Sequence, residues 1–292
     1  MIEKGSLTFK RRCVKTIRFA ARDRRPTLFQ ITIAERRRAP HLSVNPIKHV
    51  GEFVKHHVVA VVQVRGTRFD LPDATSANPA ALAFLGGSNG GVQDNRQLGV
   101  EVDVLDENTV RGGSFSSFDV LVLGVRAYEV RPDLRAASAQ ILDFSRAGGT
   151  VLVQYNRGSL GSLAPQAIQV GRGSPRVSDE TAEVTLLAPL SPALTTPNQI
   201  TQFDFEGWVQ ERGLYFAASW DNAYVPLLEM NDPGEEARHG SLLVATVGEG
   251  LFIYTGLAFF RQWASRVPGA YRLFANLISL DPANWREFTS RN

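Results

Sequence analysis

The chain is poor in cysteine: Cys13 is the only one among its 292 residues. A single cysteine excludes an internal disulfide and any zinc site built from cysteine ligands. Arg11, Arg12 and Lys15 lie close to it in sequence, and cations of this kind lower the pKa of a thiol. We interpret Cys13 as an incidental thiol within that basic segment.

Long apolar stretches are missing as well. No run of about 18 apolar residues is present, so the sequence predicts no membrane-spanning helix. The basic N-terminus has no uninterrupted apolar segment before a small-residue cleavage site, and a signal peptide is not predicted. We therefore expect a soluble chain, and the sequence leaves its compartment open.

The excess of Lys and Arg over Asp and Glu lies at one end of the chain. Residues 1–60 hold 14 Lys or Arg and 4 Asp or Glu, whereas residues 61–292 hold 18 and 25. A basic arm of this kind binds nucleic acid or anionic lipid in some proteins. No RNA-binding or helix-turn-helix signature accompanies it, so nucleic acid is an unlikely partner. We expect residues 1–56 to be a basic, poorly ordered N-terminal extension.

From residue 57 onward the pattern is typical of an α/β protein. Apolar runs that favour strands occur at residues 56–64, 81–91, 98–110, 118–125 and 150–155. Three of them are continuous, as in strands buried on both faces. Between the last two strands, residues 131–149 predict a helix that begins near Pro132 and ends at Gly148. Strand, helix and strand in this order predict a mostly parallel, open sheet flanked by helices.

The second half of the chain is less regular. Residues 158–200 are rich in Gly, Ser and Pro and predict an irregular, β-rich insertion. Residues 207–216 and 224–230 are strand-like, and residues 240–257 predict a hairpin that turns at its glycines. An amphipathic helix over 267–280 closes the fold. We place the α/β domain at residues 57–281, followed by a C-terminal tail at 282–292.

Polar residues follow two of the predicted parallel strands. Ligands of open α/β sheets bind outside the carboxyl ends of the strands, which here are Gly124–Glu129 and Gln154–Gly158. We expect these two loops to be neighbours in space. The ligand-binding candidates in them are Arg126, Tyr128, Glu129, Gln154 and Asn156. Arg126 either binds a carboxylate or phosphate of a ligand, or pairs with Glu129 or Glu206 and holds the loop; we favour the pairing.

A second group of candidates lies in "DFEGWVQERG" and just after it. Its members combine charge with indole rings: Asp204, Glu206, Trp208, Glu211, Arg212 and Trp220. Carboxylates beside an indole form sugar-binding surfaces, and paired carboxylates catalyse glycoside hydrolysis when correctly spaced. A purely structural role, with Arg212 paired to a carboxylate, is the third interpretation and the one that we favour.

Several long motifs resemble one bacterial family. "FDVLVLGVRAYEVRPDL", "GGTVLVQYN", "PNQITQFDFEGWVQERGLYF", "YTGLAFFRQ" and "PGAYRLFANLISL" occur in this order. They resemble the C-terminal domain of long PIG-L (LmbE-like) deacetylases, over roughly residues 85–281. The resemblance implies a flavodoxin-like fold similar to class I glutamine amidotransferases. It also implies a deacetylase domain as a partner and, since long members look exported, leaves localisation open.

The resemblance implies reactive residues in two domains, the deacetylase domain and the amidotransferase-like domain. Neither set is present in this sequence. No His-Pro-Asp-Asp zinc motif occurs, so zinc would belong to a deacetylase domain that this chain lacks, and no cofactor is expected here. The amidotransferase elbow should carry a cysteine nucleophile. The matching residues are Gln154, Tyr155 and Asn156, with Ser159 as the nearest hydroxyl.

Three functions remain as hypotheses. The first is a non-catalytic accessory module of a PIG-L-type protein that binds a carbohydrate or contacts another domain. The second is a carboxylate-based hydrolase that acts on a sugar or an N-acyl substrate through Asp204, Glu206 or Glu211. The third is a nucleic-acid binder that uses the basic arm. We favour the first, because the position of the nucleophile holds no nucleophile.

Overall fold

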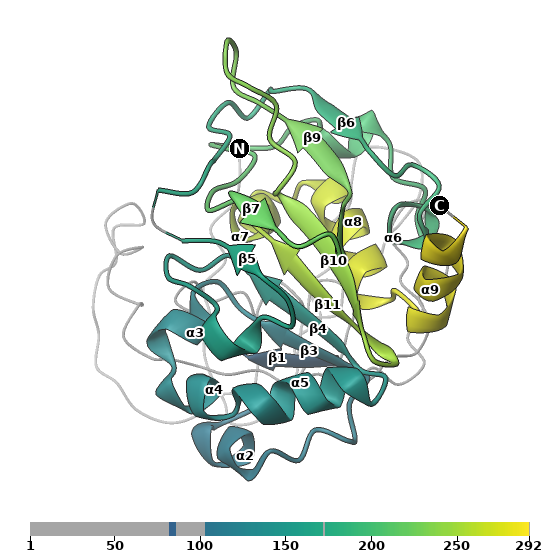
Figure 1. Cartoon of the computed structure of the whole chain (residues 1–292). Coiled ribbons are helices and arrows are strands. Elements are labelled where there is room, and N and C mark those ends of the chain that lie inside the picture. Colours follow the sequence, from purple (N-terminus) through teal and green to yellow (C-terminus); the bar gives the residue numbers. More distant parts are fainter. Residues whose placement is uncertain (1–81, 86–102, 172, 292) are drawn as a thin grey trace, which may run out of the picture. The chain divides into compact units, whose positions relative to one another are not determined.

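The computed structural model describes residues 82–85, 103–171 and 173–291, the first four as backbone alone. The basic extension at 1–56 and the strand predicted at 56–64 lie outside the described residues. All described residues belong to one compact unit, Gly51–Asn292. Figure 1 shows its elements in chain order, coloured along the sequence.

A seven-stranded sheet forms the centre of this unit. Its strands, in spatial order, are β2 (Asp103–Val104), β1 (Leu82–Leu85), β3 (Val120–Leu123), β4 (Thr150–Gln154), β11 (Gly250–Thr255), β10 (Leu242–Val247) and β8 (Tyr224–Pro226). The first five are mutually parallel, and the last two are antiparallel to their neighbours. The order of the parallel strands is that of flavodoxin-like sheets. The predicted fold class is therefore confirmed.

Alternation along the strands divides the core between two faces. Val120, Val122 and Leu152 belong to one buried cluster, and Leu121 and Val151 belong to the other. Every residue of β3, β4 and β11 is buried, as the continuous apolar runs predict.

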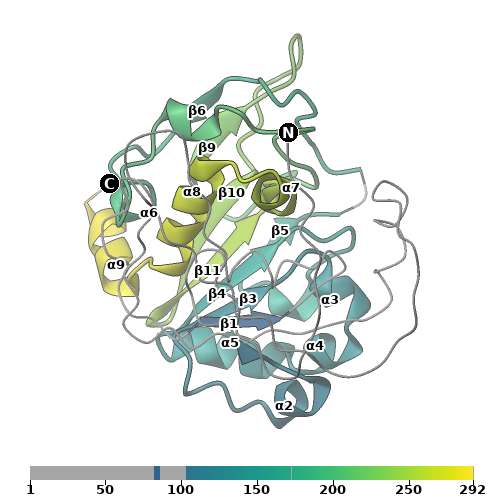
Figure 2. The same cartoon turned by 180° about the vertical axis from the view of Figure 1, so that it is seen from behind.

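Helices cover both faces of the sheet. One face packs against α3 (Ala127–Val130), α4 (Pro132–Ala136) and α5 (Ser138–Arg146), with α2 (Glu107–Gly112) beyond them. The other face packs against α7 (Phe259–Ala264), α8 (Pro268–Ile278) and α9 (Pro282–Ser290). Figure 2 shows α8 in front of β10 and β11 from this second side.

The hairpin and the closing helix agree with the sequence. β10 and β11 pair from Leu242–Thr255 to Val247–Gly250 around a turn at Gly248. Gly248 has φ +59°, and a Cβ there would lie 2.6 Å from the carbonyl oxygen of Arg146. Glycine is therefore required at this turn for both conformation and space. Helix α8 covers most of the predicted 267–280 helix.

The insertion between β4 and β8 is irregular and β-rich, as predicted. It contains η2 (Gly161–Leu163), β5 (Ile168–Gln169), β6 (Val184–Leu186), α6 (Pro192–Thr195), η3 (Gln202–Phe205) and β7 (Ser219–Trp220). β5 pairs with β7, and β6 pairs with β9 (Leu228–Met230), in two small antiparallel sheets.

Four local predictions need correction. The helix expected over 131–149 is divided at Ala137, where the Ser138 hydroxyl donates back to the Arg135 carbonyl. The strand at 98–110 keeps only β2 among its described residues, and a helix starts four residues after Asp103. The strand at 224–230 is divided between β8 and β9, which lie in different sheets.

The fourth correction concerns residues 207–216, which contain no strand. Only Gly213 makes bridges, one to Val177 and one to Leu257. A Cβ at Gly213 would lie 2.2 Å from the Gly256 carbonyl oxygen. The two backbone segments can therefore approach this closely only because residue 213 is a glycine. Long-range contacts of the side chains, described below, override the local preference for an extended strand.

The C-terminal residues are part of the folded unit. Residues 282–290 of the expected tail form α9, in which Trp285 is fully buried in the core. Among the described residues, no helix is long and apolar enough to cross a bilayer.

Candidate functional site

The loops after β3 and β4 meet, as the sequence predicts. The backbone N–H of Arg126 donates to the Tyr155 carbonyl at 2.9 Å. The backbone N–H of Glu129 donates to Oδ1 of Asn156 at 3.2 Å. These loops lie at the carboxyl edge of the parallel strands, where this sheet order places ligand sites.

Two arginines converge on one carboxylate at this edge. Arg126 donates through Nε and Nη2 to the two oxygens of Glu129, at 3.0 and 3.1 Å. Arg157 donates to the same carboxylate through Nε at 3.0 Å and Nη2 at 2.5 Å. The hydrogen bonds from Arg157 and then Arg126 lower the Glu129 pKa to about 2. Of the two pairings open to Arg126, the structure has the one with Glu129.

The lowered pKa of Glu129 predicts a dependence of stability on pH. A carboxylate with a depressed folded-state pKa stabilises the fold above its unfolded value, here 4.5, and the effect is lost as the pH falls towards 2. Since the arginines are partly exposed, we expect Glu129→Gln to cost about 1 kcal/mol at pH 7 and almost nothing near pH 2. Urea unfolding at both pH values measures the difference.

The matched control is Glu107→Gln, which removes a fully solvated ion pair with Arg111. We expect it to change stability by less than about 0.5 kcal/mol at both pH values. A cost of Glu129→Gln that stayed the same at pH 2 would contradict the coupling of Glu129 to the two arginines.

Of three further candidates at this edge, Tyr128 and Asn156 have structural roles, and Gln154 is buried. The Tyr128 hydroxyl lies 3.0 Å from Oγ of Ser138 and is buried. Asn156 donates through Nδ2 to the Gln154 carbonyl at 2.9 Å and holds the two loops together. The Gln154 side chain is 1% exposed, and its amide makes no hydrogen bond with any described residue.

Aromatic rings surround the end of β4. The ring of Tyr155 lies 5.4 Å from that of Tyr215 and 5.8 Å from that of Phe260. Tyr155 is buried, whereas Tyr215 and Phe260 are half-buried. We call Tyr155, Tyr215 and Phe260 the aromatic platform. Burial, with the negative charge of Glu211, raises the Tyr155 pKa to about 12, so its hydroxyl is protonated at neutral pH.

A third arginine lies on the far side of the platform. The guanidinium of Arg261 lies 4.9 Å from the ring centre of Phe260, within cation–π range. It donates through Nε to Glu211 at 2.7 Å and through Nη1 to the Gln210 side chain. Both Arg126 and Arg261 act electrostatically on Tyr155.

Backbone strain is concentrated around the same edge. Among the described residues, four that are not glycine have positive φ, and three of them belong here: Arg126 at 59°, Gln210 at 68° and Tyr215 at 55°. Conformations of this kind persist only where the surrounding structure holds them, and they cluster at functional sites. The carboxyl edge is therefore the best candidate site by topology, side-chain chemistry and backbone geometry.

No activated nucleophile is found among the described residues of the elbow. Gln154 and Asn156 are buried amides, and the Tyr155 hydroxyl has a raised pKa. The exposed Ser159 hydroxyl accepts from the Gly161 backbone N–H at 3.0 Å. None of these groups contacts a general base that would activate it for acyl transfer.

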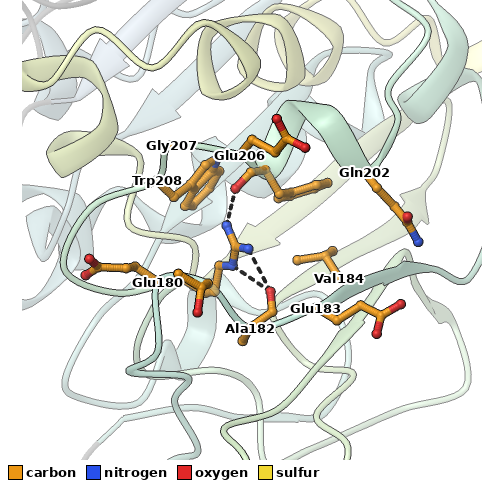
Figure 3. Close-up of a pocket in the computed structure, with 11 residues that line it drawn as sticks. Glu180, Ala182, Glu183, Val184, Gln202, Glu206, Gly207 and Trp208 are labelled. Atoms are coloured by element: carbon orange, nitrogen blue, oxygen red, sulfur yellow. Dashed lines mark hydrogen bonds between the residues drawn. The ribbon is translucent and has the colours of Figure 1, made fainter.

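The candidates in the second group are brought together only in part. Glu206, Trp208 and Arg212 line a pocket of about 440 Å³ in the insertion, with Glu180 and Glu183 on its rim. Figure 3 shows Trp208 and Ala182 among the residues that line the pocket, with Glu183 pointing away from them.

Arg212 is a buried cation without a carboxylate partner among the described residues. It donates through Nε and Nη2 to the Ala182 carbonyl, at 3.0 and 2.7 Å, and through Nη1 to the Phe205 carbonyl. Its guanidinium also lies 5.8 Å from the Trp208 ring. Burial lowers its pKa to about 10, so it stays charged at neutral pH. The predicted ion pair between Arg212 and a carboxylate is wrong, because the N–H groups of Arg212 donate to backbone carbonyl oxygens instead.

The remaining members of this group lie elsewhere. Asp204 accepts from Nε of Arg272 at 2.8 Å and caps η3. Glu211 pairs with Arg261, which lies over the Phe260 ring of the aromatic platform. Trp220 is on β7 and packs against the core cluster on the α5 face, whereas Trp208 is in the cluster on the α8 face. No cluster of metal-binding side chains is found in the described part of the chain.

Sequence reasoning missed three residues of the site: Tyr215, Phe260 and Arg261. They follow Gly213 and Gly256, whose close contact brings two distant segments to the end of β4. The aromatic pairs in "GLYF" and "LAFF" mark both segments, but only the tertiary contact shows that they are adjacent.

Comparisons with known proteins give no family. No family model and no curated protein matches the chain. Among solved structures, a β-galactosidase from Rahnella sp. R3 is 16% identical, with a TM-score of 0.34 over 60% of this chain and 25% of its own. Two cytoplasmic proteins from Salmonella typhimurium are 14% and 13% identical, with TM-scores of 0.48 and 0.42. They cover 77% and 76% of this chain and 96% and 95% of their own.

The chain thus spans about a quarter of that β-galactosidase. At these TM-scores, the similarities assign no function.

Proposed function

We propose that this chain is a non-catalytic carbohydrate-binding module that binds its ligand on the aromatic platform. The observation that carries the proposal is the gathering of aromatic rings and ion pairs at the carboxyl edge of the parallel strands. The resemblance of the sequence motifs, with Gln154, Tyr155 and Asn156 at the elbow, supports a role in binding without catalysis.

The half-exposed rings of Tyr215 and Phe260 supply apolar surface of the kind on which the C–H face of a sugar packs. Arg261 lies over the Phe260 ring and donates to the Gln210 side chain, so polar groups for ring hydroxyls are beside the platform. Buried Tyr155 supports both outer rings from below, through its contacts with each. Because its ring is packed on two sides, the platform is preorganised, which lowers the entropic cost of binding.

The resemblance of the sequence motifs extends this proposal to a context. An amidotransferase-like module of a PIG-L-type protein would place its sugar beside a deacetylase domain, on the same or another subunit. Zinc would belong to that domain. The carbohydrate and the deacetylase partner are separate parts of the proposal, and only the first depends on the platform.

A carboxylate-based hydrolase is the alternative. Asp204 and Glu211 are each held by an arginine, at 2.8 and 2.7 Å. Glu206 is exposed on the rim of the pocket. Because two of the three carboxylates are engaged in partly buried ion pairs, we favour the binding module. Sugar release by wild type that Glu206→Gln abolishes, with the fold intact, would reverse this preference.

Thermal unfolding of the full chain with a panel of monosaccharides tests the proposal. The panel holds neutral, N-acetylated, amino and uronic sugars. A ligand at 100 times its dissociation constant should add about 2.7 kcal/mol of stability. We expect Phe260→Ala to weaken binding about tenfold, because it removes one half-exposed ring of the platform.

Phe203→Ala is the matched control, since Phe203 is 77% exposed and lies on η3 outside the platform. It should leave the sugar-dependent shift unchanged. The proposal fails if no sugar of the panel shifts the transition, or if the two phenylalanine variants reduce the shift equally.

A further inference from the structure

The charges at the carboxyl edge are unbalanced towards the positive. Arg126, Arg157 and Arg261 face two carboxylates, those of Glu129 and Glu211. Arg261 and Glu211 form a pair of their own. The other three groups form a triplet in which one carboxylate serves two guanidinium groups. One positive charge is therefore left over, and it belongs to the Arg126–Glu129–Arg157 triplet.

The donors of the triplet are only partly used. Arg126 and Arg157 both bind Glu129 through Nε and Nη2. Neither uses Nη1 in a hydrogen bond with any described residue. Side-chain exposures are 26% for Arg126 and 44% for Arg157, so a ligand can reach both from solvent. Two guanidinium groups whose Nη1 donors are not used by any described residue form a ready receptor for an anion.

The triplet is also next to the aromatic platform. The backbone N–H of Arg126 donates to the Tyr155 carbonyl at 2.9 Å, and Arg157 follows Tyr155 by two residues in the same loop. An apolar ring surface and a receptor for an anion thus lie side by side. A ligand that uses both has a ring to pack on the platform and a negative group attached to that ring.

We infer that the platform selects acidic sugars, in which a carboxylate attached to the pyranose ring binds the free N–H groups of Arg157 and Arg126. This inference deepens the proposed carbohydrate-binding function and depends on it. Arg157 is the specificity-determining residue, since it is the more exposed of the two arginines. Arg126 has a positive φ and a packed backbone, and it chiefly orients Glu129.

The pocket beside Arg212 does not have this chemistry. Its guanidinium donates to carbonyl oxygens on both sides, and its rim carries Glu180, Glu183 and Glu206. Among the residues that line this pocket, Arg212 is the only cation and three are glutamates. The two regions therefore predict opposite preferences, and the preference for acidic sugars belongs to the carboxyl edge.

Calorimetric titration of the full chain with two matched glycosides tests the inference. Methyl β-D-glucuronide and methyl β-D-glucoside share one ring and differ in the carboxylate. We expect wild type to bind the glucuronide at least tenfold more tightly at low salt, with the ratio falling as salt is added. Arg157→Gln should reduce the ratio to about one by weakening the binding of the glucuronide. Acetate, which has the charge without the ring, should not bind at millimolar concentration.

Arg146→Gln is the control, because Arg146 is a solvent-exposed arginine paired with Asp143 on α5. It should keep the full preference. Equal binding of the two glycosides by wild type would overturn the inference and leave the carbohydrate module standing. A preference that survives in Arg157→Gln would overturn it too. If neither glycoside binds, and no other sugar of the panel does, the inference and the proposed function fail together.

Discussion

Arg212→Met is expected to lower the free energy of unfolding by about 2–3 kcal/mol. The variant leaves the carbonyls of Ala182 and Phe205 buried without their donor, and each unpaired buried group costs about 1–3 kcal/mol. It also removes the contact between the guanidinium and the Trp208 ring. Because the variant no longer buries a charged guanidinium, the desolvation cost that it avoids offsets part of this loss. Urea unfolding at neutral pH measures the change in the free energy of unfolding.

Two further variants separate the effect of the guanidinium hydrogen bonds from the effect of removing a positive charge. Arg212→Lys keeps the charge but not the planar fork that reaches both carbonyls, so it should recover less than half of the loss. Arg111→Met removes an exposed arginine from α2 and should cost less than about 0.5 kcal/mol. An Arg212→Met protein as stable as wild type would mean that Arg212 does not anchor the insertion.

Asn276→Leu is expected to cost about 3–4 kcal/mol. Asn276 is fully buried on α8, and its amide makes four hydrogen bonds. Oδ1 accepts from the backbone N–H and Nδ2 of Asn198, at 2.9 and 3.0 Å. Nδ2 donates to the carbonyls of Ala193 and Asn198, at 3.2 and 2.7 Å. Leucine has a similar volume but leaves the backbone N–H of Asn198 and the carbonyls of Ala193 and Asn198 without this partner inside the core.

The control for this prediction is Asn108→Leu, which changes an exposed asparagine in α2. It should alter the unfolding free energy by less than about 0.5 kcal/mol. Urea unfolding of both variants gives the comparison. A loss below about 1 kcal/mol for Asn276→Leu would show that the loop around Asn198 is not held through this amide.

The strands and their edge were predictable because their signals are local. Continuous apolar runs at 118–125 and 150–155 indicated strands buried on both faces, and β3 and β4 lie within them. The rule that adjacent parallel strands end together placed Arg126, Glu129 and Asn156 in one region. The hairpin at 240–257 was marked by its glycines. In each case a few neighbouring residues carry the whole signal.

The second candidate group was predictable only as a list of residues. "DFEGWVQERG" holds carboxylates and a guanidinium within reach of one another, but their partners come from other segments. Glu211 binds Arg261, fifty residues away, and Arg212 binds the carbonyl of Ala182, thirty residues away. The short spacing predicted contacts within the segment, whereas in the structure its charged side chains bind residues of distant segments. The same distant contacts prevent a strand at 207–216.

The sequence by itself determined the α/β class, the parallel strands and the hairpin, since each depends on residue types at short spacing. Only the tertiary structure decided that Tyr215 and Phe260 flank Tyr155, that Glu129 takes two arginines, and that Arg212 binds carbonyls. Side-chain pairing depends on which surfaces the packed chain brings within about 4 Å. That proximity is a property of the whole fold and cannot be obtained from local pattern.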